Sequence, residues 1–253
     1  MKRYALIWCS PVPKAEPMKQ RFFDAFGGPG DQWNVLVPSD EDFLARAADH
    51  DGYVISGSLK SVVDDAGTAF VDNVLGLIRN VHDSSVAPIV GVCFGSQAIA
   101  AALGGQVGKN PSGIFKLGVD RLSWSLAGGS EHWPETSSAP VIVQSHGECV
   151  LKLPKGSTRL ASSSTIENEV FLVADRILGI QGHPEVDNHG LQNGFMPVHR
   201  PLFDDASWEA IERQARQPLH SVPLISLARR LLADGTLSQS PATETRLASL
   251  GTS

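Results

Sequence analysis

The sequence has few cysteines and no long apolar run. Only 3 of its 253 residues are cysteine, at irregular spacing, so we expect no disulfide framework and a reducing compartment. No apolar stretch approaches the roughly 20 residues that a membrane-spanning helix needs. The N-terminus also lacks the basic flank and long apolar core of a signal peptide. Together these absences predict a soluble, cytoplasmic protein that makes no membrane contact.

The residue patterns of common metal and nucleotide sites are absent as well. No Cys-x-x-Cys or His-Glu-x-x-His spacing occurs, which argues against a zinc site. His132, His189 and His199 show no metal-ligand spacing. No P-loop pattern occurs either, and we expect no metal and no cofactor. The net charge is −6 with both signs mixed along the chain, which argues against nucleic acid as a partner.

The most informative segment covers residues 88–105. An apolar run ends at Cys93, Gly95 follows two residues later, and an alanine-rich amphipathic stretch then closes with two glycines. This order predicts a strand, a sharp turn and a helix, with Cys93 on the turn. Backbone N–H groups and the helix dipole at a helix N-terminus favour an anion, here a thiolate. Serine hydrolases present their nucleophile in the same way, so Cys93 is the candidate nucleophile.

A candidate base lies ninety residues further along the chain. The apolar run of residues 177–183 ends in His183, and Glu185 follows two positions later. A cysteine nucleophile needs a group that takes up its proton and later donates one to the leaving group, which histidine does near neutral pH. A carboxylate such as Glu185 can fix the tautomer and orientation of that histidine. Pro184 stiffens the backbone between the two side chains.

Four motifs together resemble those of the class I, triad-type glutamine amidotransferase family, in particular its GMP-synthetase-like standalone and γ-glutamyl peptidase-like members. In chain order they are YVISGSLKSV at residues 53–62, GVCFGSQ at 91–97, QSHGE at 144–148 and GIQGHPE at 179–185. In that family the second motif carries the nucleophile, and the His-Pro-Glu of the fourth carries the base and its carboxylate. The resemblance covers roughly residues 4–190 and implies a Cys93–His183–Glu185 triad.

The resemblance also implies roles for other residues. The oxyanion hole would be formed by Gly57, Ser58 and the backbone N–H of Phe94, and the substrate would be bound by Gln97, Ser145 and His146. Ser58 stands where the family has a second glycine, and a serine would be strained there if the position required a positive φ. Lys116 stands where relatives often carry an acidic residue that contacts the substrate amine, which favours a substrate other than glutamine.

Apolar patterning predicts alternating strands and helices in the first half of the chain. We expect strands at residues 4–8, 33–37, 53–56 and 88–92, and helices at 17–26, 40–50 with Ser39 as its cap, and 70–81. Such βα units predict a parallel sheet covered on both faces, with ligands at the carboxyl ends of its strands. The family resemblance implies the corresponding α/β fold, a three-layer, flavodoxin-like sandwich with a mostly parallel central sheet and a small antiparallel part.

The second half of the chain is more varied. Antiparallel strands are expected at 141–143 and 170–180, and helices at 207–217 and 221–233. Residues 123–140 form a polar insertion in which Trp124 and Trp133 either stack on a substrate or anchor the loop. We expect a single catalytic domain at 1–235, and residues 236–253, which are rich in Ser and Thr, to form a mobile tail.

These features support three functional hypotheses. The first is a free-standing hydrolase or peptidase that cleaves a γ-glutamyl amide, glutamine or a γ-glutamyl conjugate, through a γ-glutamyl thioester; the insertion and Lys116 favour it. The second is a glutaminase subunit that delivers ammonia to a separate synthetase. The third is a non-catalytic binding relative, suggested by the missing second glycine. The expected partner is a small-molecule γ-glutamyl substrate, with a synthetase subunit in the second case. The oligomeric state is left open.

Overall fold

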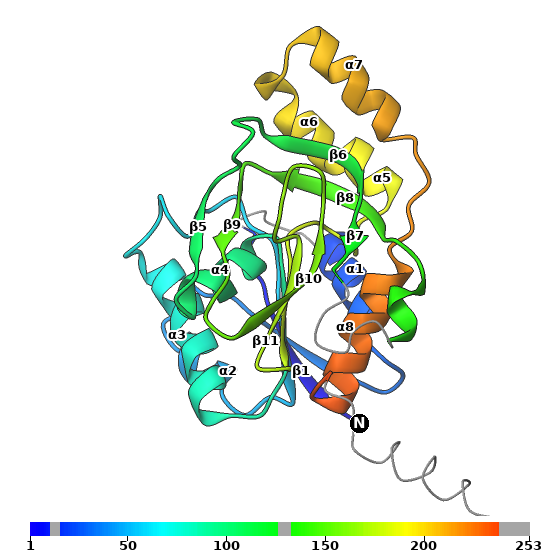
Figure 1. The fold of residues 1–253 in the computed structure, drawn as a ribbon. Helices are drawn as coiled ribbons and strands as arrows, with labels where there is room; N and C mark the ends of the chain where they lie inside the picture. Colours follow the sequence, from blue (N-terminus) through cyan, green and yellow to red (C-terminus); the bar gives the residue numbers. More distant parts are fainter. Residues whose placement is uncertain (11–15, 126–132, 238–253) are drawn as a thin grey trace, which may run out of the picture.

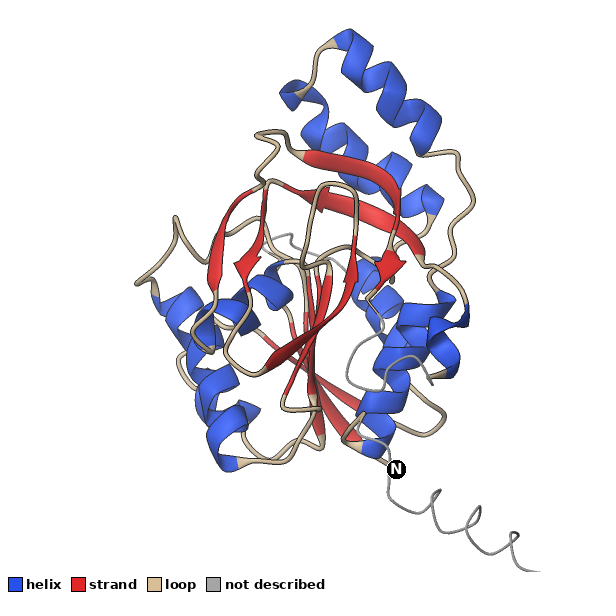
Figure 2. Cartoon of the chain, viewed as in Figure 1, coloured by secondary structure: helices blue, strands red, loops and turns tan. Residues whose placement is uncertain are grey.

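The computed structural model describes residues 1–10, 16–125 and 133–237. Its centre is an eight-stranded sheet with the strand order β2-β1-β3-β4-β12-β11-β10-β7. Figure 2 shows the strands in the middle of the molecule with helices on either side. The parallel part contains β1 (Arg3–Ile7), β2 (Gln32–Leu36), β3 (Gly52–Ile55), β4 (Ile89–Val92) and β12 (Ile177–Ile180). The antiparallel part adds β11 (Val170–Val173), β10 (Ser157–Ser162) and β7 (Ser123–Trp124). The mostly parallel α/β fold is therefore confirmed.

Helices cover both faces of this sheet (Figure 1). One face carries α2 (Phe43–Ala47), α3 (Ala69–Ser84) and α4 (Phe94–Ala102), and the other carries α1 (Glu16–Phe26) and α8 (Val222–Asp234). Successive residues of β1 alternate between two hydrophobic cores. Tyr4 and Leu6 pack in the core with α1 and α8, and Ala5 and Ile7 pack in the core with α2, α3 and α4. Strands that are buried on both sides in this way read as continuous apolar runs.

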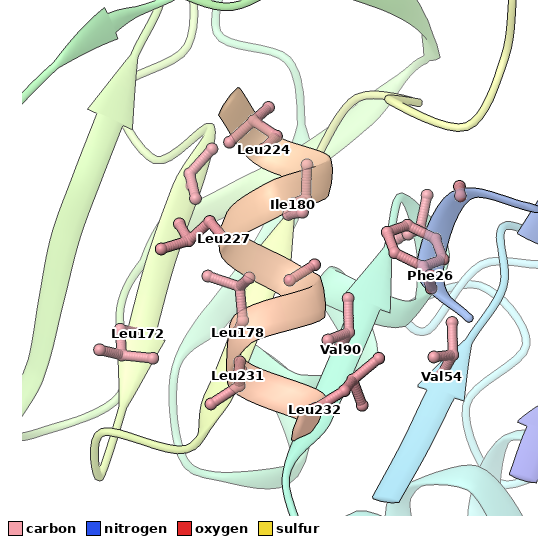
Figure 3. Packing of buried hydrophobic residues seen from close by; sticks show 14 of the residues in the cluster. Phe26, Val54, Val90, Leu172, Leu178, Ile180, Leu224, Leu227, Leu231 and Leu232 are labelled. Carbon is pink, nitrogen blue, oxygen red and sulfur yellow. The ribbon is translucent and has the colours of Figure 1, made fainter. Parts of the chain in front are cut away.

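Helix α8 shows how the sequence determines the packing. Its buried leucines, Leu224, Leu227, Leu231 and Leu232, recur at helical spacing and lie against Val90, Leu178 and Ile180 of the sheet (Figure 3). Burial of one such side chain stabilises a fold by about 1.5–3 kcal/mol. The helix ends at Asp234, and the next residue, Gly235, has a φ of 82°, the left-handed conformation common just after a helix.

A third hydrophobic cluster lies beyond the carboxyl ends of the parallel strands (Figure 1). It joins a two-stranded sheet, β6 (Lys116–Arg121) and β8 (Val141–His146), to a chain of short helices. These helices are α5 (Asn188–Gly190), the π-helix η3 (Leu191–Phe195), α6 (Met196–His199), η4 (Arg200–Leu202) and α7 (Asp205–Gln214). A further pair, β5 (Gln106–Lys109) and β9 (Glu148–Lys152), lies beside α4. The small antiparallel part is thus present.

The expected strands and helices match observed elements to within a few residues, with one exception. The helix expected over residues 40–50 is only α2, which begins at Phe43 after Asp42, and Asp42 makes no side-chain capping hydrogen bond. The expectation that Ser39 caps this helix is wrong, because residues 39–42 form turns before the helix starts. The long apolar stretch 170–180 is a hairpin whose second strand, β12, pairs in parallel with β4.

The insertion at 123–140 is tied to the body of the protein by its tryptophans. Trp124 pairs with Ala161 in the sheet and donates its indole N–H to the carbonyl oxygen of Ser138 at 2.8 Å. Trp133 is buried, with the Arg230 guanidinium 5.1 Å from its ring centroid. Residues 126–132 lie outside the described part. The two tryptophans therefore anchor the insertion.

The last described residues extend the folded part slightly past the expected boundary at 235. Leu237 is buried in the hydrophobic core beneath α1 and α8, and its N–H donates to the carbonyl oxygen of Asp175 at 2.8 Å. The rest of the expected tail, 238–253, lies outside the described residues. Among those described, no helix combines the length and apolar character needed to cross a bilayer.

Helix α4 approaches the sheet so closely that glycine is required at the contact. A Cβ atom at Gly95 would lie 2.4 Å from the carbonyl oxygen of Ile55. We expect Gly95→Ala to lower the free energy of unfolding by about 1–3 kcal/mol through overpacking, measured by urea denaturation. Gly76→Ala in α3 is the control, because its Cβ would meet only Leu44 at 3.9 Å and should be neutral or stabilising by up to about 1 kcal/mol. Equal stability of the two variants would contradict this packing argument.

Candidate active site

Cys93 lies on a sharp turn between strand β4 and helix α4. Its φ of 52° and ψ of −107° are unusual for a residue with a side chain. The turn is held from both sides, because a Cβ at Gly91 would lie 2.5 Å from the backbone of Gly95, and the N–H of Cys93 donates to the carbonyl oxygen of Ile180 at 2.8 Å. Strained backbone of this kind is characteristic of functional sites. The expected strand–turn–helix geometry is therefore present.

His183 reaches Cys93 because their strands are neighbours. Val92 and Ile180, the last residues of β4 and β12, are register partners. His183 follows β12 and is fixed by its N–H, which donates to the carbonyl oxygen of Val143 at 2.8 Å. A Cβ placed on Gly57 would lie 3.0 Å from His183 Cε1 and 3.5 Å from Cys93 Cβ. The two side chains thus converge beside Gly57.

Glu185 holds His183 by a short contact in a nearly dry setting. Glu185 Oε1 lies 2.8 Å from His183 Nδ1, and the two side chains are 3% and 7% exposed. Burial by itself lowers the pKa of His183, but the charge of Glu185 and the charge and hydrogen bond of Cys93 outweigh it and raise the pKa to about 10. The imidazole is therefore protonated at neutral pH and can supply a proton to a leaving group.

The expected oxyanion loop runs past the thiol without backbone strain. Among the described residues, positive φ at a non-glycine position occurs at Asp49, Cys93, Ala174 and Asp175, so the anticipated strain at Ser58 does not arise. The Ser58 hydroxyl donates to the carbonyl oxygen of Cys9 at 2.7 Å and accepts from the N–H of Lys60 at 3.0 Å. Gly57 is needed for its small size, since its Cβ would press on His183.

Phe94 begins helix α4, in the turn whose first N–H groups have no acceptor within the helix. Its side chain is 1% exposed, and its ring centroid lies 6.1 Å from that of Phe70. The side chain therefore belongs to the core, and only the backbone of Phe94 is available near the thiol.

The three residues expected to bind substrate lie around the same thiol. Gln97 Nε2 donates to the carbonyl oxygen of Glu148 at 2.9 Å. The carbonyl oxygen of Ser145 lies 3.8 Å from Cys93 Sγ. The ring nitrogens of His146 lie 2.9 Å from the Glu148 carbonyl oxygen and 3.0 Å from Gln144 Oε1. Two acceptors would favour a charged ring, but burial and then Lys116 outweigh them and lower the His146 pKa to about 3. His146 is therefore neutral.

Lys116 has a structural role that the sequence did not reveal. Its Nζ lies 2.7 Å from Glu169 Oε1, 2.7 Å from Asp120 Oδ2 and 2.8 Å from Ser163 Oγ. Glu169 is fully buried, and a buried carboxylate needs such a partner. Within the described chain, Lys116, Trp124 and Trp133 do not line the cavity around Cys93 that is described below. The structure thus gives Lys116 and the two tryptophans other roles than contact with a substrate, and residues 126–132 of the insertion lie outside the described part.

One cavity of about 930 Å³ connects the expected site residues. Its lining includes Gly57, Ser58, Cys93, Gln97, Ser145, His146, His183 and Glu185. Cavities of about 300–1,000 Å³ typically hold drug-sized ligands, and this one lies at the upper end of that range. The structure thus brings every expected side chain to one place, with the Phe94 backbone beside it.

Several lining residues were not anticipated from the sequence. The cavity is also lined by Phe115, Phe195, Val198, His199 and Leu202. The rings of Phe195 and His183 have centroids 4.8 Å apart, and those of Phe115 and His199 are 4.4 Å apart. Burial, and then the charge of His183, lowers the pKa of His199. The Gln-Asn-Gly before Phe195 suggests a turn rather than a helix, so no local signal in the sequence indicated that these residues line the cavity.

The comparisons with known proteins agree with this geometry. Residues 32–196 match the family model "Glutamine amidotransferase class-I". YLR126C of Saccharomyces cerevisiae, named as a glutamine amidotransferase, is 35% identical over 130 residues, which are 51% of this chain and 49% of that protein. Gamma-glutamyl peptidase 2 of Arabidopsis thaliana is 29% identical over 217 residues, 80% of this chain and 84% of that protein.

The chain is also similar to part of a longer enzyme and to a solved structure. The GMP synthase of Streptococcus mutans is 31% identical over 156 residues, which are 59% of this chain but only 27% of that enzyme. The crystal structure of a glutamine amidotransferase from Thermotoga maritima aligns with a TM-score of 0.68 and 20% identity, covering 94% of this chain and 99% of the other. That structural similarity supports the fold, and the family model covers more than half of the sequence. The chain therefore belongs to the class I glutamine amidotransferase family.

Proposed function

We propose that the protein is a free-standing hydrolase of γ-glutamyl amides that works through a γ-glutamyl thioester on Cys93. The observation that carries this proposal is the convergence of Cys93, on its positive-φ turn, with the His183–Glu185 pair in one cavity. The thiolate is the attacking form of cysteine, and His183 is the neighbouring group that can exchange a proton with the reacting atoms.

In the acylation step, Cys93 Sγ attacks the γ-carbonyl carbon and a C–S bond forms. The negative charge that develops on the carbonyl oxygen is stabilised by backbone N–H groups at Phe94 and in the Gly57–Ser58 loop. Each such donor is typically worth about 2.7–4 kcal/mol. The C–N bond then breaks, and His183 donates its proton to the departing amine. In the second step a water molecule, deprotonated by His183, attacks the thioester, so that glutamate leaves and the thiolate is restored.

The glutamyl part of the substrate carries one charge of each sign. Lys109 and Glu148 are register partners of β5 and β9, and both line the cavity. Glu148 Oε2 also accepts from Ser61 Oγ at 2.8 Å, which fixes the carboxylate. We assign Lys109 to the α-carboxylate and Glu148 to the α-ammonium group.

The free-standing reading is supported by the relatives and by the size of the cavity. The gamma-glutamyl peptidase of Arabidopsis aligns over most of both chains. A cavity of about 930 Å³ exceeds what glutamine alone would fill.

A second candidate is a glutaminase subunit that passes ammonia to a separate synthetase, because the chain aligns with a part of GMP synthase only. Turnover of γ-glutamyl amides by the isolated chain would favour the first reading. Glutamine hydrolysis that requires an added synthetase would favour the second.

We expect Cys93→Ala and Cys93→Ser to lower the release of amine from γ-glutamyl amides by about 10⁴-fold or more, since the covalent step is lost. Far-ultraviolet circular dichroism should show an unchanged fold. Cys149→Ala is the control, because Cys149 is buried and its pKa is raised to about 11, mainly by burial. Iodoacetamide near pH 7 should label Cys93 and spare Cys149. Unimpaired turnover by Cys93→Ala would disprove the assignment, and absence of selective labelling would favour a non-catalytic relative.

The raised pKa of His183 predicts a high-pH limit of activity. Because the acid form protonates the amine, kcat/KM should fall as pH rises through about 10. Glu185→Gln removes the carboxylate that stabilises the imidazolium, so this descending limb should move to lower pH. The measurement is a pH profile of kcat/KM for both proteins. An unshifted limb in Glu185→Gln would show that Glu185 does not control the proton on His183.

Glu148→Gln tests the recognition of the glutamyl group. Loss of the carboxylate should raise KM by about tenfold or more, because hydrogen bonds to charged groups contribute roughly 1.5–3 kcal/mol, with a smaller effect on kcat. Glu209→Gln is a matched control, since Glu209 is exposed on α7 and pairs with Arg213 at 3.9 Å. If steady-state kinetics gave the same KM for both variants, Glu148 would not bind the α-ammonium group.

A further inference from the structure

Several exposed apolar side chains line the cavity that contains Cys93. Four large hydrophobic side chains that are more than half exposed line this single cavity: Leu59, Ile114, Val198 and Leu202, with exposures of 66%, 64%, 60% and 60%. Exposed apolar side chains gathered at one place mark a binding surface, whereas scattered ones need no explanation. This apolar surface is continuous with the catalytic cavity, so its occupant can be a part of the substrate.

The position of His183 indicates which part of the substrate reaches this surface. The proton on His183 must be delivered to the leaving nitrogen, so the amine lies on the His183 side of the scissile bond. Phe195 packs directly against the imidazole, with ring centroids 4.8 Å apart. Val198 and Leu202 follow on the same chain of short helices and also line the cavity. The apolar surface therefore begins where the amine departs.

The segment that carries these residues is firmly supported from behind. Leu191 and Met196 are buried in the third hydrophobic cluster, against Val143 of β8. The π-helix η3 (Leu191–Phe195) begins at Leu191 and places Asn193, Gly194 and Phe195 along the cavity. A π-helical turn in a short helix is a feature common at functional sites. From the neighbouring loop Phe115 joins this surface through its contact with His199.

One part of this apolar surface lies next to His183 and consists of Phe115, Phe195, Val198 and Leu202; it is here called the apolar wall. Resting on the function proposed above, we infer that the apolar wall binds the leaving amine. The preferred substrates are then γ-glutamyl amides whose amine carries an aryl or branched alkyl group. The bond changes are those of the hydrolysis already described. The C–N bond breaks with a proton from His183, and water supplies the oxygen of the released glutamate, so no additional reactant is needed.

The test compares γ-glutamyl phenethylamide with γ-glutamyl methylamide, because these alkylamines are similar in basicity and differ in apolar size. We expect kcat/KM of the wild-type chain to be at least tenfold higher for the phenethylamide. Val198→Ser and Leu202→Ser should each reduce this ratio several-fold. Val222→Ser is the matched control: Val222 is 62% exposed, and it is absent from the cavity lining. Its ratio should equal that of the wild type.

Binding measurements separate this inference from the proposed function. In the Cys93→Ala chain, calorimetry should show tighter binding of the phenethylamide than of the methylamide, by about tenfold, and Val198→Ser should reduce the difference. That preference without hydrolysis by the wild type would refute the hydrolase but support the wall. Equal binding and equal kcat/KM for both amides would overturn the wall and leave the hydrolase intact. A ratio unaffected by Val198→Ser and Leu202→Ser, with both variants impaired only in ammonia transfer to a synthetase, would reassign the surface to protein docking and also overturn it.

Discussion

The close approach of helix α4 to the central sheet is the constraint on which the site depends. Gly91 and Gly95 allow backbone to lie against backbone, and that contact leaves Cys93 on a turn with positive φ. The same sheet pairs β4 with β12 in parallel, so the end of one strand delivers the thiol and the end of the other delivers His183. Ligand sites at the carboxyl ends of parallel strands follow from this topology. A shift of α4 would therefore disturb the position of Cys93 and its distance from His183 together.

Two groups of charged residues near the cavity have opposite effects on the protonation of two histidines, His183 and His146. Beside the cavity, Glu185 and Cys93 stabilise a proton on His183 in spite of its burial. On β6, Lys116 is the register partner of His146 and lies between Glu169, Asp120 and Ser163; its charge adds to burial in keeping His146 neutral. Both histidines are buried, which lowers the pKa of each; Glu185 and Cys93 outweigh burial at His183, whereas the charge of Lys116 adds to it at His146. In the proposed reaction only His183 has a proton to give, which prevents competition between the two rings.

The sequence predicted what is encoded locally and missed what depends on distant contacts. The turn at Cys93 has a local signature, a buried strand, a glycine and an alanine-rich helix, and its position was correct. Ser58 could not be judged locally, since its φ and its bond to Cys9 depend on how two loops meet. Lys116 suggested an altered substrate site because relatives often have an acidic residue there, and its actual partner, Glu169, lies 53 residues away along the chain and could not be seen locally. The wall residues Phe195 and Val198 follow a polar stretch, and only packing on β6 and β8 makes that segment helical.

The apolar wall and the water of the second step have to share one region, which orders the proposed reaction. In that reaction His183 gives its proton to the amine and then takes one from water, and one ring nitrogen must serve both because Nδ1 is held by Glu185. Because Phe195 packs against His183, an amine that stays on the wall keeps water from that imidazole. Departure of the amine is therefore required before the thioester can be hydrolysed. An amine that binds the wall tightly would instead attack the thioester and regenerate the amide. The affinity of the wall for the leaving amine thus has an upper limit. Val198 and Leu202 are more than half exposed to solvent, and such an open wall can bind the amine and still release it.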